Sequence, residues 1–204
     1  MSTTPDDAFR TIAKNSEAVF KDRSSKFIAY TFQVDSEEAA KQLLKQLKKE
    51  HFSAAHLCWA LVLGRSSDFQ KSSDDREPAN SAGKPILRSI LSAGLTNVYV
   101  VVVRYFGGKL LGVPGLIHAY GGAAGLAIEA SGTREVISSD RYFLEAGPSA
   151  LDELFRIFRY EGIKCFPASE KGLQGIIFEV RQSRTSELIK KLEEKNFRNP
   201  IKMP

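Results

Sequence analysis

The sequence predicts an α+β protein of two domains. Residues 25–34 alternate between apolar and polar types, as a half-buried strand does, and the valines at 100–103 are typical of a strand covered on both faces. Beyond residue 135 the pattern restarts as strand, helix, strand, strand, helix, which is the split βαβ order of ferredoxin-like domains. We therefore expect a flexible tail over 1–15, a first domain over 16–135 and a second over 136–204.

The elements of the first domain follow from apolar spacing. After the strand at 25–34 a helix is expected, because Asp35 suits an N-cap and apolar residues then recur at the spacing of one buried stripe. The lysines on its outer face are interpreted as a solvated surface, partly paired with Glu37. The remaining expected elements are a strand at 57–63, a long loop at 64–82, a helix at 83–93, a strand at 97–103 and a helix at 114–130.

The second domain is expected to be a sheet with helices on one face. Its elements are, in order, a strand over 134–146 with a break near Ser139, a helix from Pro148 that Gly162 ends, strands at 163–168 and 174–181, a helix near 186–195 and a short strand at 197–201. The other face of this sheet is then left for the first domain or for a protein partner.

Composition is that of a soluble globular protein. Hydrophobic residues make up 43% and charged residues 26%, and no apolar stretch is long enough to span a bilayer. The first residues lack the basic start and apolar core of a secretory signal. The cysteines, Cys58 and Cys165, are too few for a disulfide framework or a four-cysteine zinc site. We expect a cytoplasmic protein with no membrane partner.

Positive charge is concentrated in one stretch of the first domain. The formal net charge is +5, and no acidic residue occurs between Glu77 and Glu129. The basic side chains in that stretch are Lys84, Arg88, Arg104, Lys109 and His118. Such a pattern indicates an anionic partner, and the basic balance of the chain adds support for nucleic acid or ribosomes.

The end of the valine strand is the expected binding site. Gly107 and Gly108 bring bare backbone amides next to Arg104 and Lys109, which favours a phosphate ligand. The free amides at the start of the 83–93 helix, beside Lys84, are a second candidate anion seat. The aromatic residues here either stack on bases or belong to the core: Tyr105, Phe106 and Tyr120.

Three acids in the long loop leave several interpretations open. Asp74, Asp75 and Glu77 are dense enough to bind a hard cation or to act in acid/base chemistry, although the spacing of known metal loops is absent. A surface turn held by local hydrogen bonds competes with that interpretation. Alternatively, the acids fold over and pair with Arg104 or Lys109, which would support the glycine loop.

Two further patterns argue against simple enzymatic assignments. His56 and Cys58 point to the same face of a strand, and they are interpreted as a hydrogen-bonded histidine beside a buried thiol rather than as a catalytic pair. The 104–115 turn matches neither the phosphate loop nor the dinucleotide fingerprint, so no cofactor is expected.

Several stretches of the first domain together match one known pattern: 23–28, 55–60, 73–78, 82–87 and 101–120. On these motifs the chain resembles the YigZ/IMPACT family, and its second domain resembles the C-terminal module of bacterial members. Arg76, Asn80 and Pro114 depart from the pattern, because glycine is common at each of these positions. The resemblance implies a first domain similar to part of a small-subunit ribosomal protein and to domain IV of elongation factor G. It also implies nucleic-acid or ribosome binding.

The leading hypothesis is a non-catalytic RNA-binding or ribosome-binding protein that regulates translation. A metal-dependent hydrolase or phosphotransfer enzyme acting on a phosphorylated substrate is the alternative, and a protein-interaction module that uses the second sheet is the third. The residues expected to bind phosphate or nucleic acid are Lys84, Arg104, Tyr105, Gly107, Gly108, Lys109 and His118, and the supporting or metal-binding acids are Asp74, Asp75 and Glu77.

Overall fold

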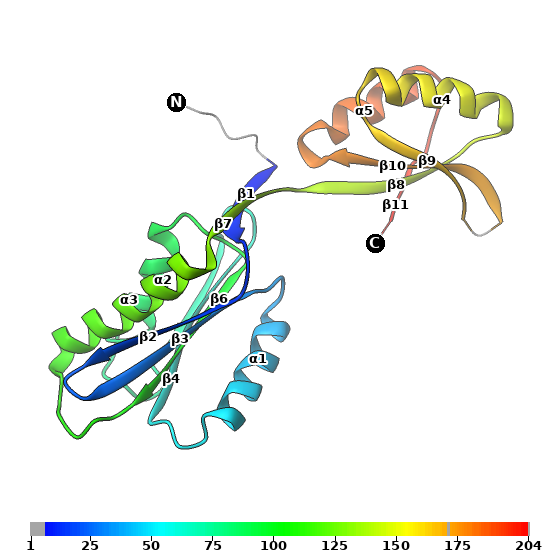
Figure 1. Ribbon diagram of the computed structural model, residues 1–204. Coiled ribbons are helices and arrows are strands. Elements are labelled where there is room, and N and C mark those ends of the chain that lie inside the picture. The colour runs from blue at the N-terminus through cyan, green and yellow to red at the C-terminus, as the bar shows by residue number, and fades with distance from the viewer. Residues whose placement is uncertain (1–6, 171, 204) are drawn as a thin grey trace. The chain divides into compact units, whose positions relative to one another are not determined.

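The computed structural model describes residues 7–170 and 172–203, and the chain forms two compact units. One unit is Phe9–Val136, and the other consists of Ile137 onward together with the segment that ends at Ala8. Each unit has its own sheet and its own apolar core (Figure 1). The chain is therefore a mixed α/β protein of two units, which we describe separately.

The first unit is built on a five-stranded sheet in which β6 lies between β3 and β4, antiparallel to both. In order across the sheet, the strands are β2 (Ser16–Asp22), β3 (Ser25–Gln33), β6 (Val98–Tyr105), β4 (His56–Leu63) and β5 (Phe69–Ser73). Two short strands, β1 (Ala8–Ile12) and β7 (Thr133–Ile137), pair with each other in a separate sheet.

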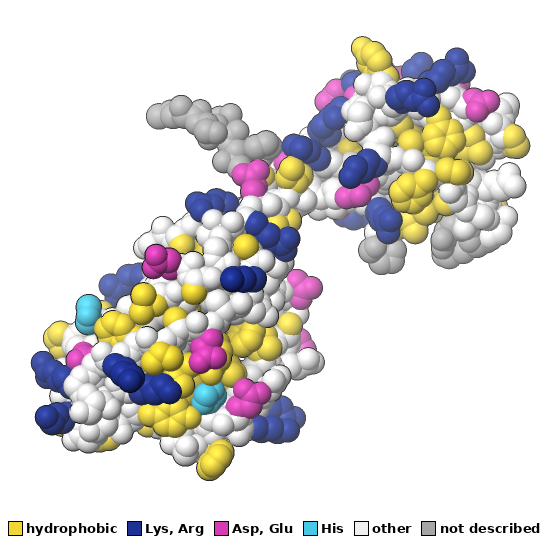
Figure 2. Space-filling view, in the orientation of Figure 1, with side chains coloured by type: hydrophobic (Ala, Val, Ile, Leu, Met, Phe, Trp, Pro, Cys, Tyr) yellow, Lys and Arg dark blue, Asp and Glu magenta, His cyan; other side chains and the backbone are white. Residues whose placement is uncertain are grey.

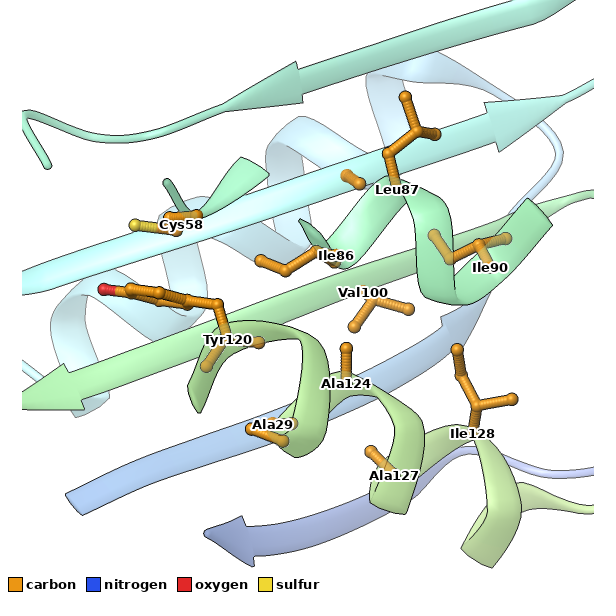
Figure 3. Close-up of a cluster of buried hydrophobic side chains, with 14 of the residues drawn as sticks. Ala29, Cys58, Ile86, Leu87, Ile90, Val100, Tyr120, Ala124, Ala127 and Ile128 are labelled. Atoms are coloured by element: carbon orange, nitrogen blue, oxygen red, sulfur yellow. The ribbon is translucent and has the colours of Figure 1, made fainter. Parts of the chain in front are cut away.

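Helices cover both faces of the five-stranded sheet. On one face lie α2 (Gly83–Ser92) and α3 (Gly112–Ser131), and on the other lies α1 (Glu37–Glu50) (Figure 1). Alternate residues of β6 point to the two faces, so Val100 packs under α2 and α3 (Figure 3) while Val101 packs under α1. Both valines are fully buried, which confirms that the valine run is a strand covered on both sides.

Three local expectations need correction. Ser36, not Asp35, caps α1, because its Oγ accepts a hydrogen bond from the Ala39 amide at 3.3 Å. The strand β5 lies inside the expected loop, since an edge strand can form without the apolar alternation that identifies a strand in sequence. The expected tail over 1–15 contains β1, whose Ile12 is buried in the core of the first unit; residues 1–6 lie outside the described residues.

The second unit is a four-stranded antiparallel sheet with the strand order β11-β8-β10-β9. Its elements are β8 (Ser139–Glu145), α4 (Pro148–Tyr160), β9 (Lys164–Glu170), β10 (Leu173–Arg181), α5 (Gln182–Glu194) and β11 (Ile201–Lys202). Phe158 of α4 stacks on Phe178 of β10 inside its core, with ring centroids 4.7 Å apart. Across residues 7–170 and 172–203, no helix has the length and apolarity that a membrane crossing requires.

Candidate nucleic-acid interface

Arg104 is buried at the end of β6. Strand register places it beside Phe27 of β3 and His56 of β4, and its side chain points toward the face that α2 and α3 cover. The residue is only 5% exposed, and its guanidinium lies over the rings of Phe27 and Phe106, at 5.6 and 5.4 Å from their centroids.

The partner of Arg104 is a carboxylate of the chain itself. Nη1 of Arg104 donates to Oε1 of Glu77 at 2.6 Å, and the Tyr120 hydroxyl donates to the same oxygen at 2.7 Å. Burial raises the pKa of the Tyr120 hydroxyl, so it remains a protonated donor. The Arg104 guanidinium, which was expected to contact phosphate, thus forms an internal ion pair. This pairing is one of the interpretations that the sequence left open for the loop acids.

Asp74 fills the second expected anion seat. Its Oδ1 accepts hydrogen bonds from the amides of Ala82 at 3.0 Å and Gly83 at 2.8 Å, where α2 begins, and its Oδ2 accepts from the amide of Asn80 at 2.9 Å. A carboxylate at this place satisfies amides that a helix start leaves without partners and interacts favourably with the helix dipole. The free amides that were expected beside Lys84 are therefore occupied by the chain.

Asp75 holds the loop against the start of β4. Its Oδ2 accepts from the Leu57 amide at 2.8 Å, and its carbonyl oxygen accepts from Nδ1 of His56 at 2.8 Å. Each of the three acids is thus bonded to donors of the chain. In the part of the chain that the structure describes, no group of three His, Cys, Asp or Glu residues is arranged to hold a metal. These contacts support the interpretation of a hydrogen-bonded turn.

Backbone conformation explains why glycine is common at two of the positions where this sequence departs from the family pattern. Arg76 and Asn80 have φ values of 72° and 62°, in the left-handed region that favours glycine. Asparagine tolerates this region better than other non-glycine residues, whereas arginine pays a steric cost there. The internal bonds of Asp74, Asp75 and Glu77 hold the loop in this conformation.

Cys58 is a buried thiol rather than a nucleophile. It is fully buried, and its Sγ donates to the Asp74 carbonyl oxygen at 3.0 Å. Burial raises the pKa of the Cys58 thiol, which keeps it protonated at neutral pH. The interpretation of His56 and Cys58 as structural residues agrees with these contacts.

Gly107 is required by a close approach of two loops. A Cβ atom added here would lie 2.1 Å from both the carbonyl carbon and the oxygen of Ser24, in the β2–β3 turn. The Gly107 amide donates to Oγ of Ser25 at 3.2 Å, so the chain already uses it. Gly108 has φ +83° and no heavy atom within 4 Å of an added Cβ. Gly107 therefore joins the two loops, and Gly108 supplies the left-handed backbone conformation beside it.

The other predicted binding residues do not converge on Arg104. Tyr105 points to the α1 face of the sheet, where its hydroxyl is 2.9 Å from Nδ1 of His51. Lys84 is exposed at the start of α2 and lines a different pocket, together with Lys71. His118 is exposed on α3, with its ring 5.7 Å from that of Phe20 on β2. A phosphate contact of Lys84 or His118 stays a prediction.

The contact at Gly107 assembles a cluster of cations, of which only Lys109 was among the predicted binding residues. It places the β2–β3 turn against the loop that follows β6, and Figure 2 shows Lys and Arg side chains at this end of the unit, at the lower left of the view. We call this cluster the basic end, and its members are Lys21, Arg23, Lys26 and Lys109, all exposed. Arg23 and Ser24 both have positive φ, so the turn has the geometry of a tight hairpin without its usual Asn-Gly signal.

A cleft of about 460 Å³ opens beside this end. Its polar lining comes from His56, Glu77 and Arg104, and its apolar lining includes Phe106, Leu110 and Val113. The cleft joins the loop after β6 to the first turn of α3. Of the residues expected to bind phosphate, Arg104 lines this cleft, together with Glu77 from the loop acids.

Fold and site define a two-unit α/β protein with a basic end and a partly apolar cleft. The model of the Impact N-terminal domain matches residues 23–128, which include the lining of the cleft and every member of the basic end except Lys21. The chain therefore belongs to the IMPACT family.

Named relatives extend this finding. The IMPACT family member YigZ of Escherichia coli is 40% identical over 125 residues, which are 60% of this chain and 61% of YigZ. The Bacillus subtilis member YvyE is 42% identical over 97 residues, which are 48% of this chain and 45% of YvyE. The matched regions thus span roughly half the length of these relatives. A crystal structure of a hypothetical protein aligns over 97% of both chains, with a TM-score of 0.68 and 28% identity.

Proposed function

We propose that the first unit binds RNA, on the ribosome or during translation, without catalysing a reaction. The observation that carries this proposal is the approach of Gly107 to Ser24, which brings the basic end together from two loops far apart in sequence. Its four cations are exposed, and within the described ranges none forms an ion pair with a carboxylate. They are free to contact phosphates, whereas Arg104 is neutralised by Glu77.

The interaction with RNA is expected to depend strongly on salt. Each phosphate that a lysine or arginine neutralises releases condensed counterions, which gives a slope of about −0.7 per contact for a single strand in a plot of log affinity against log salt. Four such contacts correspond to a slope of about −3. A role in regulating translation is the part of this proposal that rests on the family resemblance, and a cytoplasmic location is proposed from the composition and the few cysteines of the sequence.

The fold assignments belong to the same proposal. We infer that the second unit is ferredoxin-like, because its β-α-β-β-α-β order and its strand order fit that arrangement. The likeness of the first unit to a ribosomal-protein domain and to domain IV of elongation factor G is proposed from the family resemblance. Phe166 and Ile201 are exposed on strands of the second sheet, and a protein partner on that sheet stays a prediction.

The proposal is tested by removing the charges of the basic end. The variant Lys21→Gln, Arg23→Gln, Lys26→Gln, Lys109→Gln is compared with the natural chain by fluorescence anisotropy, with a labelled single-stranded RNA and a series of KCl concentrations. We expect the salt slope to fall from about −3 to near zero, with a loss of affinity at low salt.

A matched control removes the same charge elsewhere. It carries glutamine at the four exposed lysines of α1, which are Lys41, Lys45, Lys48 and Lys49. The control is expected to keep most of the affinity and most of the slope. Equal losses in both variants would refute a localised RNA site and would leave only non-specific attraction by net charge.

A further inference from the structure

We propose that the cleft beside the basic end takes up one unpaired base of the bound RNA. This inference rests on the proposed function and names what part of the RNA enters the protein. The cleft, at about 460 Å³, lies in the size range of pockets that hold small organic groups. Lys109 lies in the same loop as Phe106 and Leu110, which line the cleft, so phosphates bound at the basic end are held near its mouth.

The apolar lining suits the flat faces of a base. Two large apolar side chains of this lining are exposed rather than buried: Phe106 is 49% exposed and Leu110 is 84% exposed. The Arg104 guanidinium lies 5.4 Å from the centroid of the Phe106 ring and restricts its position. A ring fixed in this way is a stacking platform, and bases of every type can stack on it because each has a π face.

The charges of the lining favour a neutral group over a phosphate. Glu77 cancels the charge of Arg104 at 2.6 Å, so a phosphate that entered the cleft would meet the Glu77 carboxylate as well as the guanidinium. A base is uncharged and is not repelled. The electrostatics thus place the phosphates outside, at the exposed lysines, and the base inside.

Hydrogen-bonding groups are available for the edge of a base. Nε of Arg104 is buried and has no hydrogen-bond partner among the described residues, although a buried donor of this kind normally has one. Nδ1 of His56 donates to the Asp75 carbonyl oxygen at 2.8 Å, and its Nε2 lies 3.9 Å from Oε1 of Glu77. The lining therefore offers a donor in Arg104 and an acceptor in the Glu77 carboxylate beside the apolar surface.

The test compares RNA strands that have the same backbone and differ in one base. A single-stranded oligomer with one central 2-aminopurine is measured against an oligomer whose central ribose carries no base. With the natural chain we expect the first strand to bind roughly 5- to 150-fold more tightly, as stacking of one base predicts, and its fluorescence to change on binding. The variant Phe106→Ala is expected to lose this difference.

The control is Phe52→Ala, which removes a phenylalanine that is 86% exposed at the C-terminal end of α1. It should keep both the difference between the strands and the fluorescence change. If both strands bind equally but the basic-end variant still loses affinity, the base inference is wrong and the proposed function stands. If neither strand binds, both fail. Binding of an apolar peptide in the cleft without any discrimination between the strands would also overturn the inference, in favour of a protein partner.

Discussion

The buried pair of Glu77 and Arg104 can be tested by changing Glu77 to glutamine. This substitution keeps the size of the side chain and removes its charge, which leaves a guanidinium that is 5% exposed without a counter-charge. Removal of one member of a buried ion pair costs about 3–5 kcal/mol. A domain is typically stable by about 5–15 kcal/mol, so the change removes a large share of the stability of the first unit. The melting temperature should fall by about 10–20 °C.

Two further variants separate the ion pair from its surroundings. Tyr120→Phe removes the second donor to Glu77, together with the contact of that hydroxyl with Cys58, and should cost about 1.5–3 kcal/mol, as expected for a hydrogen bond to a charged group. The double variant Glu77→Leu, Arg104→Met removes both charges and should be more stable than Glu77→Gln alone, because no charge is then left buried without a partner. Urea unfolding followed by circular dichroism measures all three. A cost below about 1 kcal/mol for Glu77→Gln would contradict the reasoning and would return Arg104 to the set of ligand-binding cations.

Two other outcomes follow from the packing. Gly107→Ala should destabilise the first unit by about 2–3 kcal/mol or more, because the added Cβ would overlap the Ser24 backbone. Gly108→Ala should cost only about 1–2 kcal/mol, the cost of placing alanine in the left-handed conformation. Thermal melts compare the two variants, and equal losses of stability would contradict the loop contact. Burial raises the pKa of the Cys58 thiol, so Cys58 in the folded protein should resist iodoacetamide at mildly alkaline pH. The partly exposed Cys165 should react first. Mass spectrometry identifies the labelled cysteine, and labelling of Cys58 first would refute its assignment as a buried thiol.

The elements of secondary structure that have a clear local sequence pattern were predicted correctly. The run of valines at 100–103 predicted a strand buried on both faces because few other environments accept consecutive branched apolar residues. The break near Ser139 was also visible, and β7 ends at Ile137 while β8 begins at Ser139. The strand β5 was missed because an edge strand with the sequence Phe-Gln-Lys-Ser-Ser has no alternation to read.

The site was harder to predict because its partners are far apart in the chain. The sequence identifies Arg104 as a cation at the end of a strand, and such a cation can bind either a phosphate or a carboxylate of the chain. Glu77 lies 27 positions away in the sequence, and this separation does not show whether Arg104 binds Glu77 or an external phosphate. The basic end was missed for a related reason. The β2–β3 turn is 82 residues from Gly107, and only the steric need for a glycine there reveals their contact.

The Glu77–Arg104 pair links the stability of the first unit to its proposed specificity. An unpaired Arg104 in the cleft would attract any phosphate, including free nucleotides and inorganic phosphate, and would compete with the lysines outside for the backbone of the RNA. With Glu77 in place, the attraction of phosphate falls to Lys109 and the β2–β3 turn, which are exposed and sensitive to salt. The cleft is left electrically balanced. In the proposed mode of binding, the carboxylate that stabilises the loop therefore also makes discrimination between ligands depend on an uncharged group, while affinity depends on the charges around the cleft.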